Sequence, residues 1–230
     1  MSPRHLRLTL VFIVMTMLSE SAQAYKQWDL SWTLAQGGIQ SMRVSTLNDQ
    51  HGSAGVPEFD RGMVYTGGNL QAKIHEFIVG VDGGAYFGQD QRNDTYAVSL
   101  TGSYFVTRTG YAVIDGQRLR VYPLIGIGAA RLKDTITDHG TSPPVTSRLT
   151  AWNMLLDISV EAQYLVPFYR KGNRDYGIDV RVQTGYRFSP IKREWEHSGS
   201  SRNVPIGFPA KMGVAGPFVS VSMGIYGRKQ

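Results

Sequence analysis

Apolar and polar residues alternate along much of this chain. In the segment GIDVRVQTGYRF, residues 177–188, the apolar side chains of Ile178 and Val180 alternate with Asp179 and Arg181. Successive side chains of an extended chain point to opposite faces, so a period of two predicts a β-strand. The segment therefore predicts a strand with one apolar face and one face that carries charges of both signs.

Seven segments show this alternation clearly, and an eighth shows it weakly. The weak segment is GMVYTGGNLQA, residues 62–72, which lies between the first two clear segments. No segment beyond the N-terminal region reaches roughly 18 uninterrupted apolar residues, so the sequence predicts no transmembrane helix there. The clear segments are residues 28–44, 75–87, 96–106, 119–129, 152–166, 177–188 and 219–225.

The connections between these strands fall into two classes. Some are short, whereas the others are polar and mostly long. Long loops at one end of a sheet and short turns at the other are the layout of a bacterial outer-membrane barrel. We therefore predict an all-β fold, a single antiparallel up-and-down transmembrane β-barrel of eight strands over residues 25–230. The short connections lie near 72–74, 108–116 and 167–175, and the long ones at 47–61, 88–94, 134–147 and 191–213.

Residues 1–24 predict a cleaved signal peptide. Arg4 and Arg7 precede an apolar run over residues 8–18, and Ala22-Gln23-Ala24 supplies the small-residue pattern that a signal peptidase requires. A helix over that run would reach only about 16 Å, which is too short for the hydrocarbon core of a bilayer. An uncleaved anchor is the alternative.

The composition narrows the classes of function. The 230 residues include 26 glycines, 12 tyrosines and no cysteine. The lack of cysteine excludes thiolate catalysis, zinc–cysteine sites and disulfide bonds. The formal net charge of +6 makes the chain mildly basic. For an exported protein, this charge favours outer-membrane lipids with anionic headgroups as partners, and argues against nucleic acid.

The alternation leaves open which face of the strands meets solvent. A soluble, periplasmic lipocalin-like barrel keeps its apolar face inside around an apolar ligand, whereas a membrane barrel turns that face to lipid. The apolar runs are about ten residues long, which suits a tilted membrane strand. Aromatic residues also cluster near their ends, as in interfacial girdles. We favour the membrane interpretation, in which Val98, Leu100 and Tyr104 of segment 96–106 would face lipid.

In the membrane interpretation, the charged face lines a narrow lumen. With eight strands the interior is just filled by side chains, which disfavours a general porin. Charges of both signs could close such a lumen by pairing with one another. On a soluble protein the same charges would form a solvated face. The predicted lumen ion-pair network is Arg118, Arg120, Asp157, Glu161, Asp179, Arg181 and Arg187.

Three stretches carry a family likeness: VYPLIGIGAARL at 121–132, GYRF at 185–188 and GPFVSVSMGIYGR at 216–228. They resemble the small outer-membrane β-barrel proteins of Gram-negative bacteria, the group of OmpA-like, OmpX-like and OmpW-like eight-stranded domains. The resemblance implies an outer-membrane location, insertion by the barrel-assembly machinery and no single activity. Barrels of this group usually end on an aromatic residue, whereas this chain continues past Tyr226 to Gln230.

The segment REWEHSGS, residues 193–200, offers candidates for catalysis. Glu196, His197 and Ser200 supply the carboxylate, base and hydroxyl that acyl transfer requires. Some barrels of the group that this chain resembles deacylate lipid A, with a His and a Ser two positions apart. His197 and Ser198 do not reproduce that spacing. We therefore interpret the segment as a solvated loop and keep a lipid-A-modifying acyl hydrolase as the alternative.

Two acidic clusters could bind Ca²⁺ or Mg²⁺ through carboxylate oxygens. Oxygen ligands at irregular loop spacing are weak indicators of a metal site. We interpret both clusters as solvated loops and expect no metal and no other cofactor. The first cluster is Asp134, Asp138 and His139, and the second is Asp49, His51, Glu58 and Asp60.

Basic residues of the last long loop, together with a tryptophan, predict a contact with lipopolysaccharide. Arginine and lysine bind phosphate groups, and tryptophan is enriched at membrane interfaces. Unpaired surface charge is the alternative. The residues are Lys192, Arg193, Trp195 and Arg202.

Together these observations favour a non-enzymatic barrel protein of the cell envelope. Its expected role is structural, adhesive, or the binding of a small amphiphile. The acyl hydrolase and the soluble periplasmic carrier of an apolar ligand are the alternatives, and the sequence does not indicate an oligomeric state.

Overall fold

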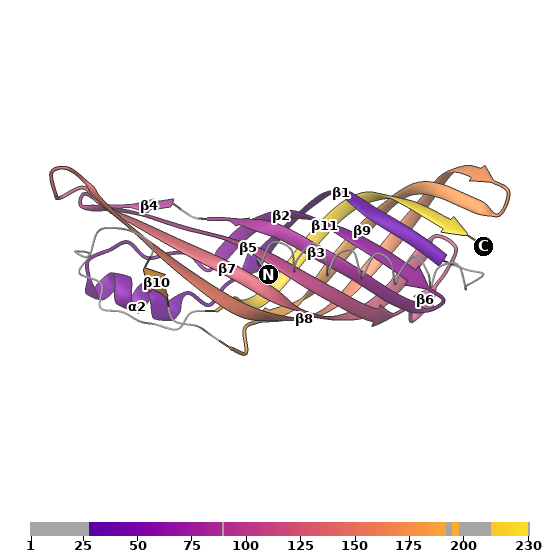
Figure 1. The fold of residues 1–230 in the computed structure, drawn as a ribbon, viewed down its shortest axis with the longest axis horizontal. Coiled ribbons are helices and arrows are strands. Elements are labelled where there is room, and N and C mark those ends of the chain that lie inside the picture. The colour runs from indigo at the N-terminus through magenta and orange to yellow at the C-terminus, as the bar shows by residue number, and fades with distance from the viewer. Residues whose placement is uncertain (1–27, 89, 192–194, 198–212, 230) are drawn as a thin grey trace, which may run out of the picture.

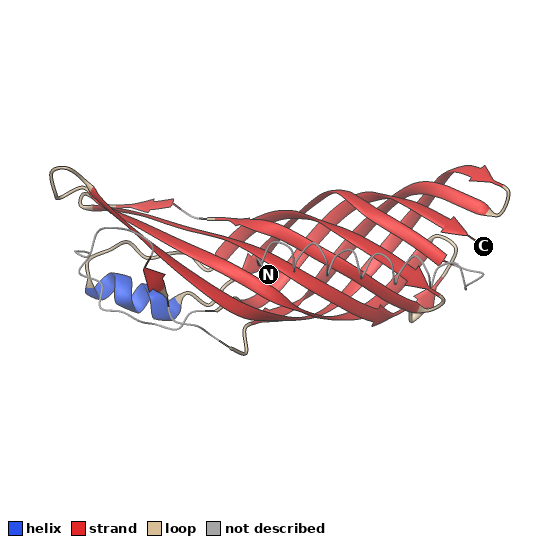
Figure 2. Ribbon diagram, viewed as in Figure 1, coloured by secondary structure: helices blue, strands red, loops and turns tan. Residues whose placement is uncertain are grey.

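The computed structural model describes residues 28–88, 90–191, 195–197 and 213–229. Most of these residues belong to one antiparallel sheet that closes on itself as a barrel (Figures 1 and 2). Among them, no helix is long or apolar enough to span a membrane. The expected signal peptide at 1–24 lies outside the described residues.

Eight long strands of the described chain form the wall of the barrel. Their order is β8-β9-β11-β1-β2-β3-β5-β7, and β7 pairs with β8 to close the ring. This arrangement confirms the eight-stranded up-and-down prediction, including the weak segment at 62–72, which lies in β2. The strands are β1 (Trp28–Ser41), β2 (Gly62–Ile74), β3 (Phe77–Phe87), β5 (Tyr96–Tyr111), β7 (Leu119–Asp138), β8 (Val145–Lys171), β9 (Arg174–Phe188) and β11 (Ala215–Lys229).

The two ends of the barrel differ as the connection lengths predict. The first and last strands begin and finish at one end, where Trp28 pairs with Lys229 (Figure 1). Short turns close this end, for example at Gly172, whose φ of 61° favours glycine. We call it the turn end. The opposite end carries the long connections, and we call it the loop end.

Short strands and one helix lie at these two ends. At the loop end, β4 (Asp90–Arg92) pairs with β5, and β10 (Glu196–His197) pairs with β8. At the turn end, β6 (Ile114–Asp115) pairs with β7. The helix α2 (Ser45–Ser53) lies in the long connection between β1 and β2, where the alternation predicted only a loop.

The strands β5, β7 and β8 project beyond the other long strands of the barrel at the loop end (Figure 1). The sequence predicted a long loop over 134–147, but β7 runs to Asp138 and β8 starts at Val145. Threonines favour strands, and the hydroxyls of Thr137 and Thr146 lie 3.1 Å apart across the ladder. The polar residues expected in a loop therefore extend a hairpin.

The outer surface of the barrel is apolar. Outward positions of the eight long strands carry large aliphatic and aromatic side chains that remain exposed, and inward positions are buried. The outward direction expected for the apolar faces is therefore confirmed for six of the seven clearly alternating segments, all but 96–106. Exposed outward residues include Trp32, Leu34, Ile39, Phe77, Ile125, Ile127, Ile158, Val160, Val182, Val219, Val221 and Ile225.

The expectation that the apolar face of segment 96–106 meets lipid is wrong. Val98, Leu100 and Tyr104 are only 2%, 1% and 5% exposed and point into the barrel, whereas Phe105 on the opposite face is 52% exposed. The reason is that the interior of the barrel changes along its length. It is charged over the middle and apolar near the loop end, and β5 lines both parts.

Candidate functional site

The side chain of Arg187, on β9, is completely buried in the lumen. Its Nε donates a hydrogen bond to Asp157 Oδ2 at 3.0 Å. Its guanidinium carbon lies 4.3 Å from the ring centroid of Tyr104 and 4.2 Å from that of Phe218. A guanidinium can stack on an aromatic face while its edge binds a carboxylate. Arg187 thus joins the charged middle of the lumen to its apolar part.

A second arginine, Arg108 on β5, also pairs with the carboxylate of Asp157. Its NH2 lies 3.0 Å from Asp157 Oδ2, and it also forms an ion pair with Asp82 of β3. Its NH1 donates to Gln183 Oε1 at 3.1 Å. Buried ions are tolerated when each has a partner and further hydrogen bonds. These contacts cross the lumen from β3 and β5 to β8 and β9.

A third cluster lies nearer the turn end, around Arg181 of β9. Arg181 pairs with Asp179, which also accepts a hydrogen bond from Gln163 Nε2 at 2.8 Å. Arg181 NH1 donates to Gln71 Oε1 at 3.2 Å and to Asn69. Together with the first two arginines, this cluster lines the middle of the lumen with charge-assisted hydrogen bonds.

Glu161, on β8, is buried at the centre of these clusters. Its Oε1 has no hydrogen-bond partner among the described residues. It lines a cavity of about 10 Å³ together with Asp82 and Arg108. A cavity of roughly this size can hold one water molecule, and a buried carboxylate oxygen would be its natural acceptor partner.

The structure places most of the predicted network on the lumen face, but not all of it. Arg120, Asp157, Glu161, Asp179, Arg181 and Arg187 are buried there. Arg118 is instead exposed, because it lies in the turn before β7 begins at Leu119, outside the closed part of the ring.

Arg108 and Asp82 belong to the network and were missed by the sequence analysis. Arg108 lies on the same face of β5 as Tyr104, and that face was expected to meet lipid. The signal that could have identified Arg108 is its position. It continues the alternation of Tyr104 and Val106, so an arginine lies on the face that was assigned to lipid, which indicates that this face points inward.

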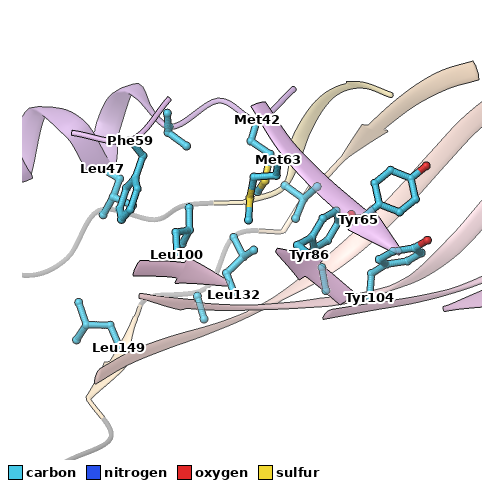
Figure 3. Packing of buried hydrophobic residues seen from close by; sticks show 14 of the residues in the cluster. Met42, Leu47, Phe59, Met63, Tyr65, Tyr86, Leu100, Tyr104, Leu132 and Leu149 are labelled. Carbon is cyan, nitrogen blue, oxygen red and sulfur yellow. The ribbon is translucent and has the colours of Figure 1, made fainter. Parts of the chain in front are cut away.

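The loop end of the lumen is filled by an apolar cluster that we call the cap. It includes Leu47 of α2 and side chains from the connection that follows this helix (Figure 3). Asn48 fixes that connection, since its Nδ2 donates to Phe59 O at 2.7 Å and its Oδ1 accepts from Phe59 N at 2.9 Å. The cap includes Met42, Leu47, Val56, Phe59, Met63, Leu100, Leu132, Ile136, Leu149 and Trp195.

One polar pair is buried inside the cap. His51 Nε2, at the end of α2, lies 3.1 Å from Asp134 Oδ2 on β7, and both side chains are fully buried. His51 Nδ1 lies 3.0 Å from Pro57 O. Burial raises the pKa of the Asp134 carboxyl, and the hydrogen bond with His51 partly offsets that effect.

The two acidic clusters considered as metal sites do not assemble in the structure. Asp134 pairs with His51, so one residue from each cluster forms a pair across the cap. Among the described residues, no group of three or more histidine, aspartate or glutamate side chains is arranged to hold a metal ion.

The residues expected to bind lipopolysaccharide or to catalyse acyl transfer are only partly described. Lys192, Arg193, Ser200 and Arg202 lie outside the described residues. Glu196 and His197 form β10, and Glu196 is exposed. The interfacial position expected for Trp195 is wrong, because this side chain is only 7% exposed and packs in the cap.

A separate ionic cluster ties the strands together at the turn end. Asp175 of β9 accepts a hydrogen bond from Arg170 Nε at 2.6 Å and from Arg228 NH2 at 2.9 Å. The hydrogen bonds from these two guanidinium groups lower the pKa of the Asp175 carboxyl. The cluster joins the β8–β9 hairpin to β11.

No family model and no curated protein matches this chain. Among solved structures, it is similar to Ail, the attachment invasion locus protein of Yersinia pestis. The identity is 11% and the TM-score 0.41, and the alignment covers 89% of this chain and 99% of Ail. It is also similar to Neisserial surface protein A, at 13% identity and a TM-score of 0.34, with 87% of this chain and 96% of that protein covered.

A third similar structure is the outer membrane protein AlkL, at 13% identity and a TM-score of 0.37. The alignment covers 90% of this chain and 92% of AlkL. The likeness is one of fold, and the barrel of this chain rests on its own strand pairing.

Proposed function

We propose that this protein is a non-enzymatic outer-membrane barrel of the cell envelope, with a lumen closed to solutes and a role in structure or surface interaction. The observation that carries this proposal is the distribution of side chains in the wall. Charged residues that pair with one another face inward, and large apolar residues face outward. A soluble carrier of an apolar ligand requires the reverse.

The apolar surface has the height of a bilayer. On β8, outward side chains from Trp152 to Val166 are mainly large and apolar. That stretch rises about 46 Å at ~3.3 Å per residue. A tilt of about 45° converts this length to about 33 Å across the membrane, enough for the hydrocarbon core and part of the interface.

The edge of this surface near the loop end supports a contact with lipid headgroups. The guanidinium carbon of Arg131 lies 5.5 Å from the ring centroid of Trp152, at the point where β7 and β8 become polar. A tryptophan at headgroup level beside a cation suits the phosphates of lipopolysaccharide and other outer-membrane lipids. We therefore assign the expected lipopolysaccharide contact to this pair as well as to the last loop.

The projecting hairpin supports a role outside the membrane. Beyond Arg131, the outward residues of β7 are polar, including Lys133, Thr135 and Thr137. The strand continues for about 25 Å past the apolar surface at ~3.3 Å per residue. Such a rigid extension, stiffened by the cap, offers a surface for adhesion without requiring a flexible loop.

Heat-dependent mobility on a denaturing gel tests the membrane part of the proposal. We expect the protein in the outer-membrane fraction, with different positions for unheated and boiled samples, because a closed membrane barrel resists detergent until heated. Finding the mature protein in the soluble fraction with a single gel position would contradict the proposal.

Two further measurements test the closed lumen and the absence of catalysis. In planar bilayers we expect no conductance steps from the wild-type protein, because three arginines and their carboxylates occupy the lumen. Mass spectra of lipid A from cells with and without the protein should be identical. Loss of an acyl chain that depends on the protein would favour the acyl hydrolase.

A further inference from the structure

A charged cavity of about 150 Å³ opens at the turn end of the barrel. Its lining comes from the start of β1, the end of β2, the turn that carries β6, the start of β7 and the end of β11. The cavity could hold several water molecules or one small ligand. Its charged lining consists of Asp29, Lys73, Asp115, Arg120, Arg228 and Lys229.

Positive charge exceeds negative charge in this lining. Arg120 pairs with Asp29 at 2.5 Å and with Asp115 at 3.1 Å, and Lys73 shares the same Asp115 at 2.7 Å. Lys229 forms no ion pair with the described residues. Arg228 pairs with Asp175, which leaves Lys229 as the cation of the lining without a carboxylate partner among the described residues. An anionic ligand would balance that charge.

Two guanidinium donors in the lining also lack acceptors. The Nε–H groups of Arg120 and Arg228 are buried and have no hydrogen-bond partner among the described residues. Arg120 Nε lies near Asp115 Oδ1, but it is not aligned for a hydrogen bond. A buried donor without an acceptor is costly, so both groups favour a ligand that brings oxygen atoms.

We propose that this cavity binds a small oxyanion of the phosphate class. The Nε–H groups of Arg120 and Arg228 would donate to phosphate oxygens, and Lys229 supplies a positive charge. This site goes beyond the closed-lumen role, because it needs only an open mouth at the turn end. Its ligand is either a soluble phosphate compound or the phosphate group of a neighbouring lipid.

Calorimetric titration with inorganic phosphate tests the site. The protein is purified from membranes in dodecyl maltoside, and chloride keeps the ionic strength constant. We expect saturable binding by the wild-type protein. K229Q should weaken it at least fivefold, because it removes a charge that no described ion pair uses. R228K should weaken it at least tenfold, because it keeps the charge but loses the Nε–H donor.

The control variant is K171Q, at the exposed tip of the β8–β9 hairpin. It removes the same charge from the same end of the barrel without touching the cavity. Binding by K171Q should stay within twofold of the wild-type value. Gel mobility of every variant reports whether the barrel is folded, so loss of the site is distinguishable from loss of the membrane fold.

Repeating the titration in phosphatidylglycerol nanodiscs separates the two sources of phosphate. If binding persists there, the ligand is soluble; if binding is lost there but present in dodecyl maltoside, the lipid phosphate occupies the cavity. Absence of saturable binding in dodecyl maltoside would overturn the proposal. Equal loss in K171Q and K229Q would also overturn it, because it would indicate diffuse attraction.

Discussion

His51 and Asp134 are 83 positions apart in the chain, yet His51 Nε2 lies 3.1 Å from Asp134 Oδ2 inside the cap. His51 Nδ1 faces Pro57 O at 3.0 Å, so this nitrogen must carry a hydrogen. With Nδ1 as the donor to Pro57 O, Nε2 is the acceptor toward Asp134, and burial raises the pKa of the Asp134 carboxyl, which favours the protonated acid that donates this hydrogen bond. The docking of α2 therefore depends on the proton of Asp134.

We predict that the cap loosens as pH rises and that D134N removes this dependence. The raised pKa of Asp134 means that the folded cap binds a proton more tightly than the unfolded chain. Its contribution to stability is present at low pH and lost as pH rises through the folded pKa. The side-chain amide that D134N introduces would donate to His51 Nε2 at any pH, because its N–H groups do not titrate.

Hydrogen exchange of residues 45–61, measured from about pH 4 upward and corrected for the intrinsic rate of exchange, tests this effect. Wild-type protection should fall with pH, and that of D134N should stay level. D134A serves as the control, with protection lowered at every pH, because the unsatisfied histidine costs about 1–3 kcal/mol. Parallel pH profiles for wild type and D134N would contradict the role of the Asp134 proton.

Replacing Arg187 should destabilise the barrel strongly. R187Q removes the cation that contacts Asp157 and leaves a buried carboxylate less compensated. Breaking a buried ion pair from one side costs about 3–5 kcal/mol. We expect a lower urea midpoint in detergent and conversion to the boiled gel position at lower temperature.

The exposed Arg118 supplies the matched control for that measurement. R118Q removes an arginine charge outside the lumen and should change the urea midpoint little. R187K should recover only part of the loss, because a lysine keeps the charge but cannot bind Asp157 edge-on while stacking on Tyr104. Equal midpoints for R187Q and R118Q would show that the lumen pairs do not stabilise the barrel.

The eight-stranded fold follows from the sequence because alternation depends only on the geometry of extended chains. Even the weak segment 62–72 forms a strand, since β1 and β3 each offer it a ladder. Strand ends were less predictable. The sequence predicted a loop over residues 134–147, but β5 pairs with β7 as far as Asp138, and the inward side chains of Ile136 and Leu149 pack in the cap. These long-range contacts extend the hairpin and are not visible in the sequence.

The sequence predicted the inward-facing residues of the lumen only on strands whose inward face is charged. On β8 and β9, inward residues alternate with an apolar outer face, which is how Asp157 and Arg187 were found. On β5, the inward face is apolar because the cap closes over it, so alternation alone cannot distinguish inside from outside. The helix α2 has no strong amphipathic pattern, and its position depends on distant contacts such as His51 with Asp134.

A charge on the outer surface of the wall should be costly in a bilayer. Ile158 is 58% exposed in the middle of the apolar surface. I158R would place a cation in the hydrocarbon core and should lower the free energy of unfolding in lipid vesicles by about 2–4 kcal/mol. R148Q, on the polar part of the same strand, should have little effect. A soluble barrel would tolerate I158R, so unchanged stability in vesicles would argue against the membrane-facing surface.

The ionic cluster at the turn end should lose its contribution to stability in acid. Hydrogen bonds from Arg170 and Arg228 lower the pKa of Asp175. A carboxyl group with a lowered folded pKa stabilises the protein above its unfolded pKa of about 4, and this effect disappears as pH falls through the folded value. D175N should therefore be less stable than wild type at pH 7, and the two urea midpoints should converge below about pH 4.

D115N, whose carboxylate pairs with Lys73 and Arg120, controls for general loss of negative charge at this end. A difference between D175N and wild type that stays constant down to pH 2 would show that Asp175 acts through packing and not through its charge.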